Sequence, residues 1–192
     1  NLKFDIYGNF YAQGTFNVKD KFLYINSIKT EDSQFKGSIK FENKKTFIKL
    51  YGKYLSLSND DLLNYLTKEA DDTEIDLIVA LEKLKLKNEI ILDNINLQMK
   101  CDAVKCFEGY MSANIDNQKR VEMQLKPLGN EEKWIVTSDD AGRFLKALNL
   151  YKKVEGGNLL LEITTKRSEV KPGQIIPVVD GNIIIKKFSP AP

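Results

Sequence analysis

The sequence predicts a mostly β protein: one long, twisted and curved antiparallel meander with two short helices. Three observations support this fold class. Apolar and polar residues alternate over most of the chain, turn-forming residues separate the alternating segments at intervals of roughly 10 to 14 residues, and only two segments have a helical pattern. A chain of 192 residues is long enough to bury its own core. We therefore expect one β-rich unit over 1–192, interpreted as a fragment of a larger protein because it begins with Asn1 inside a predicted strand.

Each predicted strand has apolar residues at every second position, which places them on one face of a sheet. The N-terminal strands, in 1–57, include two segments whose apolar residues are Leu2, Phe4 and Ile6, and Phe35, Ile39 and Phe41. The central meander, 75–136, has four such segments, with Ile75, Leu77, Val79 and Leu81; Ile95, Leu97 and Met99; Phe107, Met111 and Ile115; and Val121, Met123 and Leu125. The C-terminal strands, 156–188, contain Leu159, Leu161 and Ile163, and then a last strand from Ile183 to Phe188. We expect no ladder beyond it, through Ser189-Pro190.

Two segments interrupt the alternation and predict short helices. The first, 58–70, has leucines on a helical face after Ser58 or Asn59, either of which is a suitable N-cap. The second, 138–152, has an amphipathic pattern after Ser138-Asp139-Asp140 and is expected to end before Gly156-Gly157. Two short helices do not cover the apolar face of so long a sheet. The sheet is therefore expected either to be groove-like or to fold over on itself.

Histidine is absent from the sequence, and its absence excludes several classes of enzyme. A chain without imidazole has no Ser-His-Asp or Cys-His catalytic system, no zinc site with His ligands and no His-based pH switch. Lys and Arg total 29 against 27 Asp and Glu, and the two signs are interleaved, so we expect no nucleic-acid partner. No apolar run approaches the roughly 18 to 20 residues of a membrane span.

Pairs of acids are the remaining candidates for acid and base catalysis. The pairs Asp60-Asp61 and Asp139-Asp140 stand at predicted helix starts, where negative charge stabilises the exposed N–H groups, so we interpret both as helix caps. Asp71-Asp72 is expected in a solvated loop. The sequence therefore predicts no catalytic residue and no enzymatic activity.

Cys101 and Cys106 leave two alternatives, a cross-strand disulfide and two free thiols. Their spacing matches no C-x-x-C redox or zinc pattern, so no metal site is predicted. If the two strands pair directly across 102–105, the odd-numbered apolar positions of the first strand face even-numbered positions of the second. The apolar residues of the second strand are odd-numbered, so only a bulge reconciles the two patterns. The register therefore favours free thiols.

The second predicted helix and the strands after it resemble a known family. Thr137–Glu162 contains four features in succession: an acidic pair, Ala141-Gly142, a leucine-rich helix reaching Leu150-Tyr151, and Gly156-Gly157 before a strand. Pro177, Gly181–Phe188 and Ala191-Pro192 fit the closing strand of the same pattern. It is similar to the C-terminal part of bacterial AsmA-like proteins, a superfamily that includes the YhdP-like and TamB-like envelope proteins. The close match covers 137–192, and Asn149 departs from it, because the family has Gly there.

The resemblance implies a lipid carrier of the bacterial envelope. Such a protein is anchored in the inner membrane by a helix that this fragment lacks, and its β-rich body lies in the periplasm. It holds phospholipids or other acyl-chain lipids on an apolar β-groove between the inner and outer membranes, with no cofactor or metal. The expected groove lining is Leu77, Val79, Leu81, Leu97, Met99, Met111, Met123, Leu125, Leu159, Leu161 and Ile163. The alternative is an envelope assembly or scaffolding factor whose exposed sheet edges pair with strands of client envelope proteins.

Overall fold

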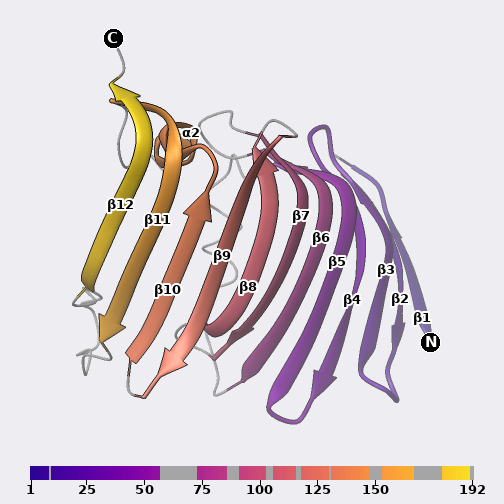
Figure 1. Ribbon diagram of the computed structural model, residues 1–192. Coiled ribbons are helices and arrows are strands. Elements are labelled where there is room, and N and C mark those ends of the chain that lie inside the picture. Colours follow the sequence, from indigo (N-terminus) through magenta and orange to yellow (C-terminus); the bar gives the residue numbers. More distant parts are fainter. Residues whose placement is uncertain are drawn as a thin grey trace.

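A single long sheet makes up most of the computed structural model of this chain (Figure 1). The structure describes residues 1–8, 10–56, 73–85, 91–102, 106–115, 118–129, 131–147, 153–166 and 179–190. Within them lie twelve strands: β1 (Leu2–Ile6), β2 (Tyr11–Asn17), β3 (Phe22–Lys29), β4 (Gln34–Glu42), β5 (Lys45–Ser56), β6 (Glu74–Lys85), β7 (Ile91–Cys101), β8 (Cys106–Ile115), β9 (Lys119–Leu128), β10 (Glu131–Ser138), β11 (Val154–Lys166) and β12 (Val179–Pro190).

The strands lie in the sheet in the order of the sequence, from β1 to β12. All neighbours pair antiparallel except β5 and β6, which are parallel. Antiparallel neighbours need only a short turn, whereas a parallel pair needs a long connection, and the longest connection in the chain runs from Ser56 to Glu74. The predicted long, open meander is confirmed, and the alternative in which the sheet folds over on itself is wrong, since β1 and β12 remain the two ends of one sheet.

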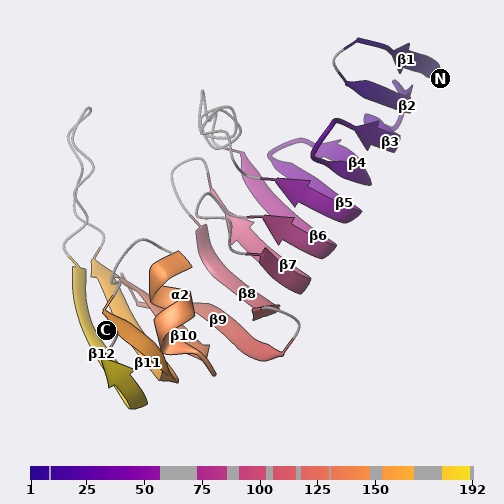
Figure 2. The ribbon, with the colours of Figure 1, turned by 90° about the horizontal axis from the view of Figure 1, so that it is seen from above.

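One short helix, α2 (Ala141–Ala147), packs on the inner side of the curved sheet at its β10–β12 end (Figure 2). It is the only helix among the described residues, where two helices were expected. The predicted helix at 58–70 falls almost wholly on residues 57–72, outside the described residues. The second predicted helix, 138–152, is shorter at its start than expected because Ser138 still belongs to β10; residues 148–152 lie outside the described part.

The start of α2 is fixed by the acidic pair before it. Asp140 is the N-cap residue: its Oδ1 atom accepts a hydrogen bond from the backbone N–H of Arg143 at 3.0 Å. Asp139 bonds instead to β9, where its backbone N–H donates to the carbonyl of Arg120 at 3.0 Å. The predicted capping role of this pair is confirmed for Asp140. The corresponding predictions for Asp60-Asp61 and Asp71-Asp72 lie outside the described residues.

The paired glycines Gly156 and Gly157 lie inside β11, which corrects their prediction as the end of the helix. Both adopt left-handed backbone angles, with φ of +60° and +80°, and Lys187 on the neighbouring strand has φ of +56°. Glycine enters this region without steric cost, so the two residues allow a local twist near the start of the strand. The ladder between β11 and β12 also continues to Pro190, beyond the predicted end, because an edge strand tolerates proline.

Cys101 and Cys106 form a disulfide at the joined ends of β7 and β8, so the prediction of free thiols is wrong. The ladder pairs Lys100 with Glu108 and then Cys101 with Cys106, so Phe107 has no residue opposite it. This bulge is the irregularity that brings the two cysteines to facing positions. Regular alternation counts residues evenly and therefore placed the two thiols on opposite faces.

Replacing both cysteines by serine is expected to lower the free energy of unfolding by about 2 kcal/mol. The bridge closes a loop with a sequence separation of only 5, and so it restricts a short part of the unfolded chain. Urea unfolding with and without a reductant measures the effect. Reductant should destabilise the native chain and leave the double variant unchanged; equal curves for the native chain in both conditions would contradict the prediction.

Candidate functional site: the apolar face of the sheet

One face of the sheet, here called the apolar face, carries the alternating apolar residues of all twelve strands. The strand registers align one residue from each strand into a row that crosses the whole sheet. Every member of this row is apolar or glycine, and in order from β1 to β12 they are Phe4, Gly14, Ile25, Gly37, Leu50, Val79, Leu97, Met111, Met123, Val136, Leu161 and Ile183. At about 4.8 Å between strands the row is about 50 Å long.

The registers place every predicted lining residue on the apolar face. In β6 and β7, Leu77 pairs with Met99 and Val79 with Leu97. The other predicted residues join through the pairs Met111–Met123, Trp134–Leu125, Trp134–Ile163, Val136–Leu161 and Ser138–Leu159, and through Leu81–Ile95. The sequence thus located residues of one surface on five strands, β6 to β9 and β11, because a regular strand turns alternate side chains to the same side.

Burial on the apolar face is uneven, deepest within β6 to β11 and least on β1. Leu125 and Leu159 are 1% and 3% exposed, whereas Leu97, Met111 and Met123 are half-buried. On β1, Leu2 is 62% exposed. The buried part of the face is a single cluster that extends from β6 to β11.

The helix α2 covers the C-terminal end of the apolar face. Its Ala141, Phe144 and Leu145 belong to the same buried cluster as Leu159 and Leu161 of β11. Gly142 permits this close contact, since a Cβ atom there would collide with the carbonyl oxygen of Val154 and lie 2.8 Å from the Cα of Glu155. Among the described residues, α2 is the only helix on the sheet, and its contacts are with β11 and β12.

The three methionines of the chain lie together near the middle of the apolar face, on β7, β8 and β9. Met111 pairs directly with Met123, and Met99 pairs with Gly109, over which its sulfur atom lies. Methionine is unbranched and polarizable, so it adapts to apolar surfaces of different shapes. This part of the face is therefore the most adaptable.

Several residues of the apolar face were not among the predicted groove-lining residues. Leu50, Leu55, Leu84 and Ile185 pack against the buried cluster, and Leu92 and Ile95 belong to it. Leu84 follows Leu81 by three residues and Leu92 precedes Ile95 by three, so strict alternation does not include them. The signal that could have identified them is the run of leucines and isoleucines itself, read with one inserted residue per strand.

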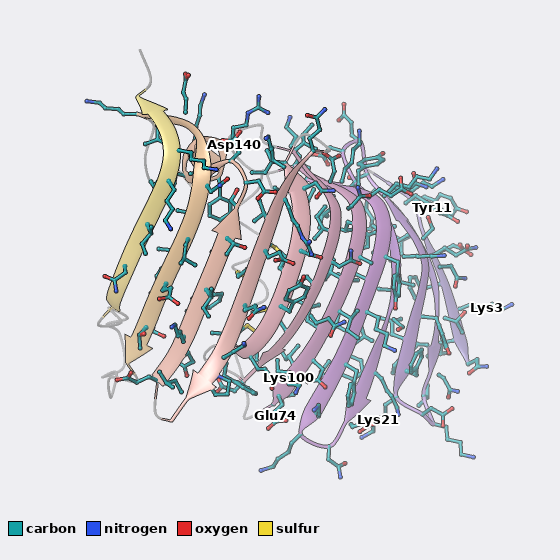
Figure 3. The ribbon with its side chains drawn as sticks, in the orientation of Figure 1. Lys3, Tyr11, Lys21, Glu74, Lys100 and Asp140 are labelled. Carbon is teal, nitrogen blue, oxygen red and sulfur yellow. A yellow bond between two sulfur atoms is a disulfide. The ribbon has the colours of Figure 1, made fainter. Side chains whose placement is uncertain are left out.

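The opposite face carries charged and polar side chains, many of them paired. Lys100 bonds to Glu108 at 2.9 Å, and this hydrogen bond raises the pKa of the Lys100 ammonium. Lys45 lies 3.0 Å from Asp76. Figure 3 shows Lys100 and Glu74 near one end of the strands and Asp140 near the other.

Two open hollows lie mostly on this polar face. One, of about 600 Å³, spans β3 to β7, and the other, of about 470 Å³, spans β6 to β9. Within the part of the chain that the structure describes, no cluster of three or more Cys, Asp or Glu side chains is arranged to hold a metal ion.

No protein-family model, no curated protein and no solved structure matches the chain. None of the helices among the described residues is long and apolar enough to span a membrane. The resemblance of residues 137–192 to AsmA-like proteins therefore stays a hypothesis.

Proposed function

We propose that this chain is a periplasmic segment of a bridge-type lipid-transfer protein, which holds the acyl chains of phospholipids on the apolar face while the head groups stay in water. The observation that carries the proposal is the row of apolar residues and glycines that crosses all twelve strands. A continuous apolar surface about 50 Å long is far larger than α2 covers. It offers a path along which a lipid moves from strand to strand.

The proposed mechanism is solvation, with no bond made or broken. Each methylene group that leaves water contributes about 0.8 kcal/mol, so a segment of about ten methylenes contributes about 8 kcal/mol before the cost of ordering the chain. The half-buried Leu97, Met111 and Met123 offer similar environments on successive strands. A lipid therefore exchanges one apolar contact for another as it moves, and no single site holds it tightly.

Two further observations support a location in the bacterial envelope. The disulfide between Cys101 and Cys106 is of a kind that forms and persists in oxidising compartments such as the periplasm and is rare in the cytosol of mesophiles. The resemblance of residues 137–192 to AsmA-like proteins points to the same place and implies an inner-membrane anchor.

Photo-crosslinking on the two faces of one strand tests the proposal. Met111 and Tyr110 are neighbours on β8 with opposite orientations, and Tyr110 is 36% exposed on the polar face. With p-benzoylphenylalanine at Met111, irradiation of bacteria that export the chain to the periplasm should give adducts heavier by the mass of a phospholipid. The same group at Tyr110 is the matched control and should give none. Equal adducts at both positions, or none at either, would refute the proposal.

A charged residue on the apolar face should prevent lipid binding, whereas the same charge on the opposite face should not. Native mass spectrometry of the purified chain should detect phospholipid, and Leu97→Asp or Met123→Glu should abolish it. The matched controls, Gln98→Asp and Gln124→Glu, add the same charges on the opposite face and should retain lipid, with circular dichroism showing that all four variants are folded. If the native chain carries no phospholipid and the apolar-face variants only unfold, the carrier proposal is wrong.

A second candidate function is favoured by the open ends of the sheet. β1 and β12 are its edges, and β1 exposes Leu2 and Ile6. Such edges are templates for an added strand, as in an envelope assembly or scaffolding factor. In that case proline substitutions in β1 should abolish crosslinks from β1 to client proteins in cells, while Met123→Glu should leave them intact. The opposite pattern favours the lipid carrier.

A further inference from the structure

A line of β-bulges interrupts the sheet at the same level on alternate strands. Asn26 is an extra residue of β3 relative to both of its neighbours, Lys53 is an extra residue of β5 opposite β4, and Asn94, with Ile95, forms a bulge of β7 opposite β8. Asn94 has a φ of +53°, which is uncommon for a residue other than glycine. Bulges re-aim side chains and are frequent beside functional sites.

The three bulged residues Asn26, Lys53 and Asn94 all line the hollow of about 600 Å³ on the polar face. Its volume is in the range of ligand sites in proteins. The three bulged residues therefore form part of its wall. The remaining wall comes from residues of β3 to β7, and its polar members include Gln34, Lys36, Tyr51, Glu82 and Asn96.

The cations of this hollow have no partner among the described residues. Lys36 and Lys53 are exposed, and neither forms an ion pair or a side-chain hydrogen bond there. In the second hollow Lys100 is bound to Glu108 and Asp76 to Lys45, which leaves Lys126 as its one lysine without an ion pair among the described residues. The first hollow therefore presents two ammonium groups, from Lys36 and Lys53, and one carboxylate, from Glu82, which is a formal net charge of +1.

The other groups in the hollow recognise hydroxyl groups. The amides of Asn26, Gln34, Asn94 and Asn96 each combine a donor and an acceptor, which is the arrangement that neighbouring sugar hydroxyls need. Tyr51 is 40% exposed, so its ring is accessible for stacking against an apolar face of a sugar. Together with two free ammonium groups, this composition fits a ligand that has many hydroxyls and a negative charge.

We propose that this hollow binds a saccharide that carries carboxylate or phosphate groups. The amides hold the hydroxyls, Tyr51 stacks against the ring, and Lys36 and Lys53 neutralise the anionic groups. The site is on the face opposite to the apolar face, so it is independent of the proposed lipid path. An envelope protein would in this way contact acidic polysaccharide or glycolipid head groups with one face while the other carries acyl chains.

Isothermal titration calorimetry with trigalacturonate, maltotriose and a short single-stranded oligonucleotide tests the site on the full chain. We expect trigalacturonate to bind at least tenfold tighter than maltotriose and the oligonucleotide. Lys53→Gln should weaken trigalacturonate binding about tenfold, whereas Lys49→Gln should change it less than twofold. Lys49 is the matched control because it is an exposed lysine of the same strand outside the hollow.

A second variant tests the amides without disturbing the bulge. Asn94→Gly removes the side chain and keeps the backbone at a φ that glycine adopts freely, so the fold should be retained and trigalacturonate binding weakened several-fold. The proposal is overturned if trigalacturonate does not bind, if Lys49→Gln weakens it as much as Lys53→Gln, or if Asn94→Gly leaves it unchanged. Equal binding of the oligonucleotide, with the same dependence on Lys53, would assign the hollow to nucleic acid instead.

Discussion

Replacing Gly142 by alanine is expected to lower the free energy of unfolding by about 2 to 3 kcal/mol. In an ordinary helix the same change is favourable by roughly 0.5 to 1 kcal/mol, because alanine restricts the unfolded chain more than glycine. At this position the new Cβ would overlap the carbonyl oxygen of Val154 and lie 2.8 Å from the Cα of Glu155. Both neighbours are backbone atoms of β11, so α2 would have to move away from the sheet and lose its contacts with Leu159 and Leu161.

Thermal unfolding followed by circular dichroism measures this effect. For a chain of this size, a loss of 2 to 3 kcal/mol corresponds to a fall in Tm of roughly 4 to 12 °C. Gly8→Ala is the matched control, because a Cβ at Gly8 meets no atom within 4 Å, and its Tm should stay within about 1 °C of the native value. A Tm for Gly142→Ala equal to or above that of the native chain would show that α2 does not press against β11.

Replacing Ile115 by alanine is expected to cost about 3 kcal/mol of stability. Ile115 is 1% exposed and lies in the buried cluster on β8, where it pairs with Leu92 of β7. Removing most of its side chain forfeits the transfer free energy of the lost carbons and leaves a cavity that neighbouring strands fill only in part. The effect is therefore larger than loss of hydrophobic area alone would give.

Urea denaturation measures the cost, with Ile184→Ala as the control. Ile184 belongs to β12 and is 44% exposed, so the same substitution there should change the free energy of unfolding by less than about 1 kcal/mol. The m-value should be unchanged in both variants, since the surface exposed on unfolding is nearly the same. Similar losses for the two isoleucines would contradict the assignment of the core to the cluster around Ile115.

Alternation of apolar residues was sufficient to predict the fold class and the face on which each lining residue lies. Leu97, Met111 and Met123 are far apart in sequence, yet they lie side by side, because short connections between β7, β8 and β9 allow little choice of register. The helix cap at Asp140 was predictable for a similar reason, since a cap depends only on residues within one turn.

The alternation did not identify every strand. β2 presents Ala12 and Gly14 on the apolar face, and small residues give a weak hydrophobic signal. β5 has Phe47 and Tyr51 on its polar face, so both faces contain apolar side chains and the period of two is obscured. In both strands the sheet itself, through its ladders, decides the structure more than local composition does.

The bulges are the part of the structure that sequence reasoning missed most completely. A bulge changes the residue count of one strand relative to its partner, and no residue type marks it unambiguously. This single difficulty explains both the wrong prediction for Cys101 and Cys106 and the failure to see the hollow lined by Asn94. The offset between two paired strands is set by contacts between residues that are far apart in the sequence. No short stretch of the sequence therefore reveals it.

The order of the strands also determines how the chain unravels. Apart from α2, the described elements pack chiefly against their neighbours in sequence, so stability is a chain of nearest-neighbour couplings, as in a solenoid. Opening then begins at the ends and proceeds one strand at a time, with β1 first, because it has one neighbour and exposed side chains. Pulling on the two termini should produce a series of small, similar force peaks in place of one large rupture, and amide exchange should slow progressively from β1 toward β8.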